Sequence, residues 1–457
     1  MVQNLRAERL GEEPVRRLLL RLSIPAAVGL IVSNSYNLVD TIFVGRLGVS
    51  AISALSVVFP IQMILASVAY GVGIGSSSLI SRLLGRGDME RAGLAAGNSI
   101  FLSLIFWLVF AFVGYFFSES LVGLFVSDAQ VMSLGAMYIR IILLGSIFLF
   151  YLRMALNILQ GQGNYFLPMF IMVLTACLNI VLDPLLIFGW WVIPSLGLEG
   201  AAIATVVSRL VGCVLITFIL MSSKNEVDIR ISGIRMDGGV VKNIFDVGAP
   251  MIMMQLLMSI TVAGTNRILE DVSITAIAVA GIYYKLQSFV LIPVLGLSRS
   301  FTPIIGYNYG ARNYVRMREA VREAVFFSFV ISMIGFLIFQ IFPGDLVRVF
   351  NADPSLTSMG VEAFRRINLL FYVMGPSLII ISFFQGIGQG MKILYILMIR
   401  QFIIFFPVLY VFTTLFGLPD LWFAFPISDM AAVIIGLILS YPDFKRLGII
   451  NLEKIIG

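Results

Sequence analysis

The chain has 457 residues, of which 59% are hydrophobic, 12% are charged and none is histidine. Soluble proteins carry about 25% charged residues, and a mean hydropathy of +1.00 would leave more apolar surface than a water-soluble fold can bury. The composition therefore excludes a soluble protein and indicates one that crosses the membrane many times. Because histidine is absent, proton chemistry near neutral pH must use carboxylates.

The composition also excludes several kinds of site. The two cysteines, Cys177 and Cys213, lie in long apolar runs, which rules out a disulfide framework. The sequence contains no Cys-x-x-Cys pattern, so a zinc or haem site is not expected. It also contains no Walker A pattern, which argues against ATP as the direct energy source. We therefore expect no cofactor. The pI near 9.3 reflects basic loops at the membrane surface, and we expect no nucleic-acid partner.

Twelve apolar runs follow one another along the chain. A bilayer core of about 30 Å needs roughly 20 apolar residues in a helix. The runs therefore predict an all-α membrane protein with twelve spans, at about 18–45, 51–82, 92–118, 131–159, 165–190, 196–222, 241–268, 274–307, 319–343, 358–385, 391–416 and 420–442. The longest polar connection predicts the division into an N-terminal lobe (1–222), a cytoplasmic loop (223–240) and a C-terminal lobe with a short cytoplasmic tail (241–457).

Basic residues are distributed unevenly between the loops. If the N-terminus is cytoplasmic, the outer loops keep only Arg46, Arg267 and Arg348. The cytoplasmic loops then hold most of the remaining arginines and lysines, as the positive-inside rule requires. This predicts a multi-pass protein of the plasma (inner) membrane with both termini in the cytoplasm.

The two lobes are similar to each other at one constant offset. The matches are Pro25 with Pro250, Gln62 with Gln287, Asp128 with Asp353, and Gln160-Gly161-x-Gly163 with Gln385-Gly386-x-Gly388. Near the end of each lobe the offset becomes slightly shorter, and there Ser208 falls on Ser428. The repeat predicts two six-helix bundles in the same orientation, and duplicated bundles are typical of secondary transporters.

The carboxylates are not repeated. Asp40 falls on Thr265, and Asp183 falls on Val408. Ionisable groups inside a span cost about 2.5–3.5 kcal/mol at its centre and are functional candidates by default. We therefore assign the ionisable chemistry to the N-terminal lobe.

The first span carries a polar face and a proline. Ser33, Asn37 and Asp40 are spaced i, i+4 and i+7 and share one side of a helix. Asn34 and Tyr36 flank this face, and Ser33, Asn34, Tyr36 and Asn37 are candidates to line a substrate cavity. Pro25 removes a backbone hydrogen bond and can kink the same helix. Such a kink either couples protonation of Asp40 to bending of the helix or is static, and the sequence leaves both open.

Three further spans bring polar groups to the depth of Asp40. Asn179 and Asp183 share a face of the fifth span, and Tyr138 and Thr205 lie on the fourth and sixth. Two carboxylates among amide and hydroxyl oxygens suit either a shared proton or a Na⁺ ion held by Asp40, Asn179 and Asp183. The alternative is that these groups form ordinary hydrogen bonds between helices.

Other polar and small residues have structural interpretations. Arg400 and Asp429 are expected to form an ion pair in the C-terminal lobe, and Arg153 is expected to reach the cytoplasmic headgroups. Gly71-x-Gly73-x-Gly75 lies inside a span, so close helix packing explains it better than a nucleotide loop.

These features resemble the multidrug and toxic compound extrusion (MATE) family over essentially the whole chain. The residues that carry the resemblance are Pro25, the segment from Asn37 to Gly45 (NLVDTIFVG), Gln160-Gly161-x-Gly163 and Asn179-x-x-x-Asp183-Pro184. Carboxylates in the N-terminal lobe alone look most like the prokaryotic branch that contains DNA-damage-inducible protein F.

The resemblance implies a V-shaped pair of bundles that alternates between outward-open and inward-open states. It also implies cation-driven efflux of bulky amphipathic or cationic drugs, and hence drug resistance. It makes Asp40 the main cation-responsive residue, with Asn179, Asp183 and Tyr138 around it. A hydroxyl of the sixth span belongs to this network, for which Thr205 is the candidate, although Ala201 is nearer by spacing.

We therefore expect an H⁺- or Na⁺-coupled multidrug antiporter that acts as a monomer and not as an enzyme. The alternative is a lipid-linked oligosaccharide flippase of the same superfamily. A flippase is expected to line its cavity with basic groups for pyrophosphate, whereas the N-terminal candidates here are neutral or acidic. A channel is disfavoured by the two-lobe repeat, and an enzyme by the lack of a nucleophile–base pair.

Overall fold

The computed structural model describes residues 7–190, 194–222, 227, 236–270, 272–350, 353–417 and 420–449. Within these ranges the regular structure is almost entirely helical. Most of the predicted inter-lobe loop, 223–240, and the tail beyond residue 449 lie outside the described residues.

Helices in the first half of the chain follow the predicted runs closely. Their bounds are α1 Ala7–Glu12, α2 Val15–Gly45, α3 Val49–Gly85, α4 Met89–Gly123, α5 Ala129–Leu144, α6 Ser146–Gly161, α7 Phe166–Ile187 and α8 Leu198–Met221. The predicted run 131–159 forms two helices, α5 and α6, which meet at an angle of 46° at Gly145.

The second half repeats this order with more interruptions. Its elements are α9 Gly238–Glu270, α10 Ile274–Gly310, α11 Tyr314–Ile341, α12 Pro343–Arg348, α13 Pro354–Ile367, the 3₁₀ turn η2 Asn368–Leu370, α14 Phe371–Ile387, α15 Gly390–Met398, the π-helical segment η3 Ile399–Phe405, α16 Phe406–Leu415, the 3₁₀ turn η4 Asp420–Phe423 and α17 Ala424–Arg446.

Ten helical segments among the described residues are long and apolar enough to cross a membrane, and the bent pair α5–α6 would be an eleventh. The sequence predicts twelve spans. The first predicted run, 18–45, lies within α2, which is a continuous helix of 31 residues but is not among the ten. The all-α membrane fold is therefore confirmed, with ten or eleven apolar helices by length and composition.

Contacts divide the chain into two compact units. The first comprises 1–9 and Val28–Ile252, and the second comprises Leu10–Ala27 and Met253–Gly457. Helices α2 and α9 are thus each shared between the units, and both divisions fall two residues after a proline, Pro25 or Pro250. These two prolines match each other in the sequence repeat, so α2 and α9 are divided between the units at equivalent positions.

The helix caps also follow the repeat. Asp88 and Asn313 cap α4 and α11 by accepting hydrogen bonds from backbone amides three residues later. Asp128 and Asp353 cap α5 and α13 in the same way. Hydrogen bonds from the Ser355 hydroxyl and from backbone amides hold the pKa of Asp353 below its ordinary value. The long helices α3 and α10, both of 37 residues, begin and end at equivalent positions.

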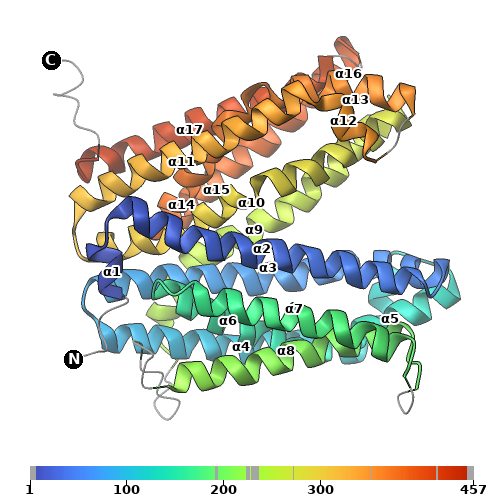
Figure 1. Ribbon diagram of the computed structural model, residues 1–457, viewed down its shortest axis with the longest axis horizontal. Helices are drawn as coiled ribbons and strands as arrows, with labels where there is room; N and C mark the ends of the chain where they lie inside the picture. Colours follow the sequence, from blue (N-terminus) through green and yellow to red (C-terminus); the bar gives the residue numbers. More distant parts are fainter. Residues whose placement is uncertain are drawn as a thin grey trace. The chain divides into compact units, whose positions relative to one another are not determined.

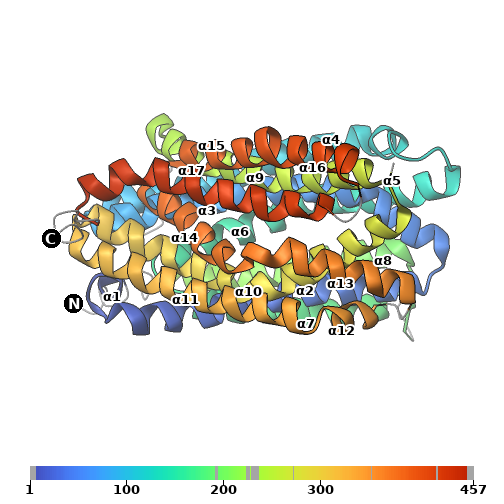
Figure 2. The ribbon, with the colours of Figure 1, turned by 90° about the horizontal axis from the view of Figure 1, so that it is seen from above.

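Each unit has its own apolar core. In the first unit, α3 packs beside α4, α5 and α6, and α7 packs beside α8 (Figure 1). Val58, Ile139 and Phe150 are fully buried there. In the second unit α10, α11 and α14 pack side by side (Figure 2) around an aromatic cluster that includes Tyr283 and Trp422.

The three glycines of α3 allow close packing within the first unit. A Cβ atom at Gly71 would lie 2.4 Å from Ile252 Cγ1, and one at Gly75 would lie 2.1 Å from the carbonyl oxygen of Ile244. A Cβ atom at Gly73 would lie 2.5 Å from the side chain of Asn157. The predicted role of this motif in helix packing is confirmed.

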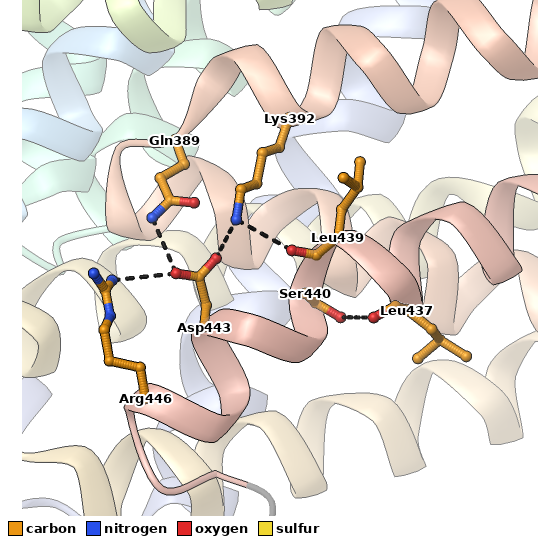
Figure 3. Close-up of polar contacts among 7 residues, drawn as sticks. All are labelled: Gln389, Lys392, Leu437, Leu439, Ser440, Asp443 and Arg446. Atoms are coloured by element: carbon orange, nitrogen blue, oxygen red, sulfur yellow. Dashed lines mark hydrogen bonds and ion pairs between the residues drawn. The ribbon is translucent and has the colours of Figure 1, made fainter.

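Two buried carboxylates of the second unit are paired with basic groups. Arg400, in the π-helical segment η3, donates a hydrogen bond of 2.5 Å from Nη2 to Asp429 Oδ1 on α17. This confirms the predicted ion pair. Near the end of α17, Asp443 accepts hydrogen bonds from Gln389 (3.2 Å), Lys392 (2.5 Å) and Arg446 (3.2 Å) and ties the start of α15 to α17 (Figure 3).

The Gly75→Ala substitution should destabilise the protein, because its Cβ atom would meet a backbone carbonyl that belongs to another helix. Overpacking of this kind costs about 1–3 kcal/mol. Thermal unfolding in detergent measures the loss. The matched control is Gly281→Ala in α10, where a Cβ atom meets nothing within 4 Å. An equal midpoint for Gly75→Ala and the wild type would contradict the packing role.

The Arg400→Met substitution should lower the free energy of unfolding by about 3–5 kcal/mol, because it leaves Asp429 buried without its partner. The double variant Arg400→Met/Asp429→Leu should be less destabilised, since no unpaired charge remains. Chemical unfolding of both variants gives the comparison. A double variant as unstable as the single one would show that the pair is not the cause.

Candidate functional site

Four helices of the first unit surround a cavity of about 70 Å³. The helices are α2, α6, α7 and α8. The lining residues are Ser33 and Tyr36 from α2; Leu149, Leu152, Arg153 and Leu156 from α6; Met172, Thr175, Ala176 and Asn179 from α7; and Thr205, Ser208 and Arg209 from α8. A cavity of this size holds a few water molecules or one small chemical group, by the general figure of about 30 Å³ per water.

Helical spacing explains why these side chains converge. Thr205, Ser208 and Arg209 are spaced i, i+3 and i+4, so α8 presents them on one face. Thr175 and Asn179 have the same relation on α7, and Asp183 continues their face one turn further on. The polar groups therefore form a continuous path from the cavity to the carboxylates.

The two carboxylates are buried beyond the cavity. Asp183 is 0% exposed, and its Oδ1 accepts a hydrogen bond of 3.0 Å from Asn179 Nδ2. Asp40 is 9% exposed and lies within electrostatic range of both Asp183 and Arg209. The electrostatic interaction between the two carboxylates fits the prediction that α2 and α7 bring them near each other.

Three oxygen atoms of this set have no hydrogen-bond partner among the described residues. They are Asp40 Oδ1, Asn179 Oδ1 and Asp183 Oδ2. Buried polar atoms are normally satisfied, so an unsatisfied cluster needs an explanation. Carboxylate and amide oxygens are suitable ligands for a proton or a hard cation such as Na⁺. The described residues contain no cluster of three acidic, histidine or cysteine ligands.

The other predicted members of the site divide into two groups. Tyr138 is buried next to Gln62 and near Asp40, and Thr205 lines the cavity together with Asn179. Ser33 and Tyr36 also line it, whereas Asn34 and Asn37 are exposed and do not. The amide of Asn37 donates to the carbonyl of Ser33 one turn earlier.

Pro25 lies elsewhere. It belongs to the segment Leu10–Ala27, which contacts assign to the second unit. Ala201, the alternative to Thr205, is fully buried and is not among the cavity-lining residues.

Sequence reasoning placed no basic group at this cavity. Arg153 and Arg209 both line the cavity, so the expectation that the N-terminal cavity is neutral or acidic is wrong. The signal that could have revealed Arg209 is its i, i+4 spacing from Thr205.

The repeat places different charges at equivalent positions. In the alignment that matches Ser208 to Ser428, Arg209 corresponds to Asp429, and in the one that matches Pro25 to Pro250, Thr175 corresponds to Arg400. In the second unit these two positions form the closed ion pair. In the first unit the equivalent positions, Thr175 and Arg209, line the cavity instead.

Comparison with known proteins decides the family. The MatE family model matches the chain twice, over residues 25–185 and 250–411. The chain belongs to the MatE family. The two matches begin at Pro25 and Pro250, the same pair of residues that opens the repeat in the sequence, which confirms the internal repeat.

Similar proteins cover nearly the full length. A FAD transporter of Shewanella oneidensis is 28% identical over 426 residues, which cover 91% of this chain and 92% of that protein. Multidrug export protein MepA of Staphylococcus aureus is 25% identical over 447 residues, or 98% of each chain. A solved MOP superfamily transporter from Pyrococcus furiosus has a TM-score of 0.89 at 28% identity, over 96% of this chain and 98% of that one.

The family match and the solved structures show a MatE transporter of the membrane and not an enzyme. They do not favour the oligosaccharide flippase. Members of this family need no cofactor for transport.

The Asn179→Leu substitution should destabilise the protein by about 1–3 kcal/mol, because Asp183 loses its hydrogen-bond donor while buried. Thermal unfolding in detergent measures the effect. Asn37→Leu makes the same chemical change at an exposed position of α2 and should leave the midpoint nearly unchanged. Equal effects at both positions would show that the buried hydrogen bond contributes nothing.

Proposed function

We propose that the protein is a secondary active antiporter that exports bulky amphipathic or cationic compounds in exchange for H⁺ or Na⁺ by alternating access. The observation that carries this proposal is the buried set of unpartnered oxygens on Asp40, Asn179 and Asp183. A set of this kind in a MatE transporter suits a coupling cation, which enters and leaves as a substrate.

Asp40 is the main cation-responsive residue in this proposal. Its carboxylate interacts electrostatically with both Asp183 and Arg209, and its repeat equivalent is Thr265. A proton or Na⁺ at Asp40 removes the cost of keeping two carboxylates close together away from water. Both cations would use the same oxygens, so they compete.

Neutralisation of Asp40 also weakens the attraction for a cationic substrate. Binding of the cation therefore releases the substrate, and binding of the next substrate to the carboxylate releases the cation. Tyr138 and Thr205 complete the polar surroundings of this exchange. The exposed amides of Asn34 and Asn37, together with Ser33 and Tyr36, provide the substrate-facing part of α2.

The proposed setting follows from the loop charges. The protein functions as a monomer in the plasma membrane, with both termini in the cytoplasm. Pro25 lies where α2 changes from one unit to the other, so it is the proposed point at which cation binding alters the helix.

Transport in proteoliposomes under separately imposed pH and Na⁺ gradients tests the proposal. The wild type should export an amphipathic cation such as a fluorescent dye when one of the two gradients is present, and the effective gradient identifies the coupling ion. Asp40→Asn should abolish gradient-driven export, because the amide can neither release a proton nor hold Na⁺ as a charged ligand.

The matched control is Asp128→Asn, which makes the same change at an exposed N-cap where asparagine caps a helix equally well. Size-exclusion chromatography and thermal unfolding establish that both variants are folded. Export by folded Asp40→Asn at the wild-type rate would refute the assignment of Asp40.

A further inference from the structure

The proposed exchange of cations assigns no ligand to the basic groups of the cavity. Arg209 lines the cavity from α8, and Arg153 lines it from α6. The Nη1 atom of Arg209 is buried and has no hydrogen-bond partner among the described residues. Arg209 as a whole is half-buried, and the group that best satisfies a buried, unpartnered donor on a cation is an anion.

The nearest acid leaves this donor unsatisfied. Asp40 is within electrostatic range of Arg209, but no ion pair joins them among the residues that the structure describes. The guanidinium group presents a planar fork of N–H donors, which matches the two oxygens of a carboxylate or phosphate. Arg209 therefore has an available donor that points to a ligand with negatively charged oxygens.

The walls of the cavity strengthen such an interaction. Leu149, Leu152, Leu156 and Met172 form its apolar part. Low polarity around a charged hydrogen bond makes the bond electrostatically stronger than in water. The volume of about 70 Å³ accepts one charged group and excludes the whole of a bulky molecule. An apolar substrate body would remain outside while its charged end enters.

We propose that this cavity is a subsite for the carboxylate or phosphate group of a substrate, with Arg209 as its main partner and Arg153 as a second positive charge. The inference rests on the proposed function only in treating the chain as a transporter, and it adds a class of substrate. Molecules with an anionic end, including those with both charges, bind through this end. Ser33 and Thr205 contribute hydroxyl groups beside it.

The subsite links anion binding to the proton. Asp40 and the ligand compete for the charge of Arg209, so protonation of Asp40 leaves Arg209 to the ligand. An anionic group therefore binds more tightly as the pH falls, whereas a cationic group binds more weakly. The titratable groups that act on Arg209 or line the cavity with it are Tyr36 and Asp40 on α2, Tyr138 on α5, Arg153 on α6 and Cys213 on α8, while Asp183 on α7 acts on Asp40.

Three probes of equal ring size test the proposal with the full-length protein in detergent. Benzoate, phenyl phosphate and phenyltrimethylammonium carry a carboxylate, a phosphate and a fixed positive charge. Calorimetry or the shift of the unfolding midpoint with ligand concentration measures binding. The wild type should bind at least one of the two anionic probes, and the stronger one identifies the preferred group.

Arg209→Gln should weaken binding of the anionic probes at least about tenfold, because a charge-assisted hydrogen bond is lost. Binding of phenyltrimethylammonium should stay equal or become stronger. Arg86→Gln, an exposed arginine at the C-cap of α3, is the matched control and should bind all three probes as the wild type does.

Asp40→Asn is a second variant that tests the subsite even if the Arg209 variant misfolds, because it leaves Arg209 in place. It should bind the anionic probes at neutral pH as tightly as the wild type does at acidic pH, and with less dependence on pH. The subsite is refuted if neither anion binds the wild type, or if Arg209→Gln binds them unchanged. It is also refuted if folded Asp40→Asn keeps the wild-type pH dependence.

The outcome is separate from that of the transport test. Export without anion binding would leave the antiporter standing and remove the subsite. Anion binding that is lost in Arg209→Gln, without gradient-driven export, would keep the subsite and remove the proposed coupling.

Discussion

The burial of two carboxylates within one helical bundle is the constraint that shapes the first unit. A charge removed from water costs several kcal/mol unless a partner or a hydrogen bond compensates for it. Asp183 is completely buried and receives one hydrogen bond from Asn179, while an oxygen on each carboxylate remains unsatisfied. An unsatisfied buried set of this kind lowers stability relative to a fully paired core, so a functional reason for it is expected. Exchange of a small cation is such a reason.

The two units meet the same physical cost in different ways on one scaffold. In the second unit Arg400 and Asp429 form a direct pair at 2.5 Å, and an aromatic cluster with Tyr283 and Phe425 packs nearby. In the first unit the equivalent positions hold Thr175 and Arg209, which face a cavity. Paired charges suit a structural role, whereas charges around a cavity remain available for ligands.

Much of this arrangement could be predicted from the sequence. Long apolar runs and a constant offset between the lobes are periodic signals, and they correspond to the helices and to the repeated family match. The i, i+4 spacing of Asn179 and Asp183 predicted a shared face, and their hydrogen bond has that spacing. The pairing of Arg400 with Asp429 followed from two opposite charges that would be costly alone in a membrane.

Other features depend on packing that no short sequence pattern encodes. Asn37 shares a helical stripe with Ser33 but is exposed, because the side of α2 that faces the cavity runs through Tyr36. Arg209 lies in an apolar run whose mean hydropathy obscures it; its spacing from Thr205 places the two on one face of α8, but the cavity itself is formed only by the packing of the neighbouring helices. The bend of 46° at Gly145 likewise depends on contacts, since Val206 lies where a side chain at that position would go.

The presence of two arginines beside two carboxylates sets a limit on the electrical state of this region. Guanidinium groups stay protonated at every pH in which a cell lives. With Asp40 and Asp183 both ionised, the four groups sum to zero, and each carboxylate that is neutralised adds one positive charge. The net charge of these four side chains therefore alternates between zero and positive and is never negative. A bound cation is thus attracted by the nearby carboxylate oxygens and not by the net charge of the region.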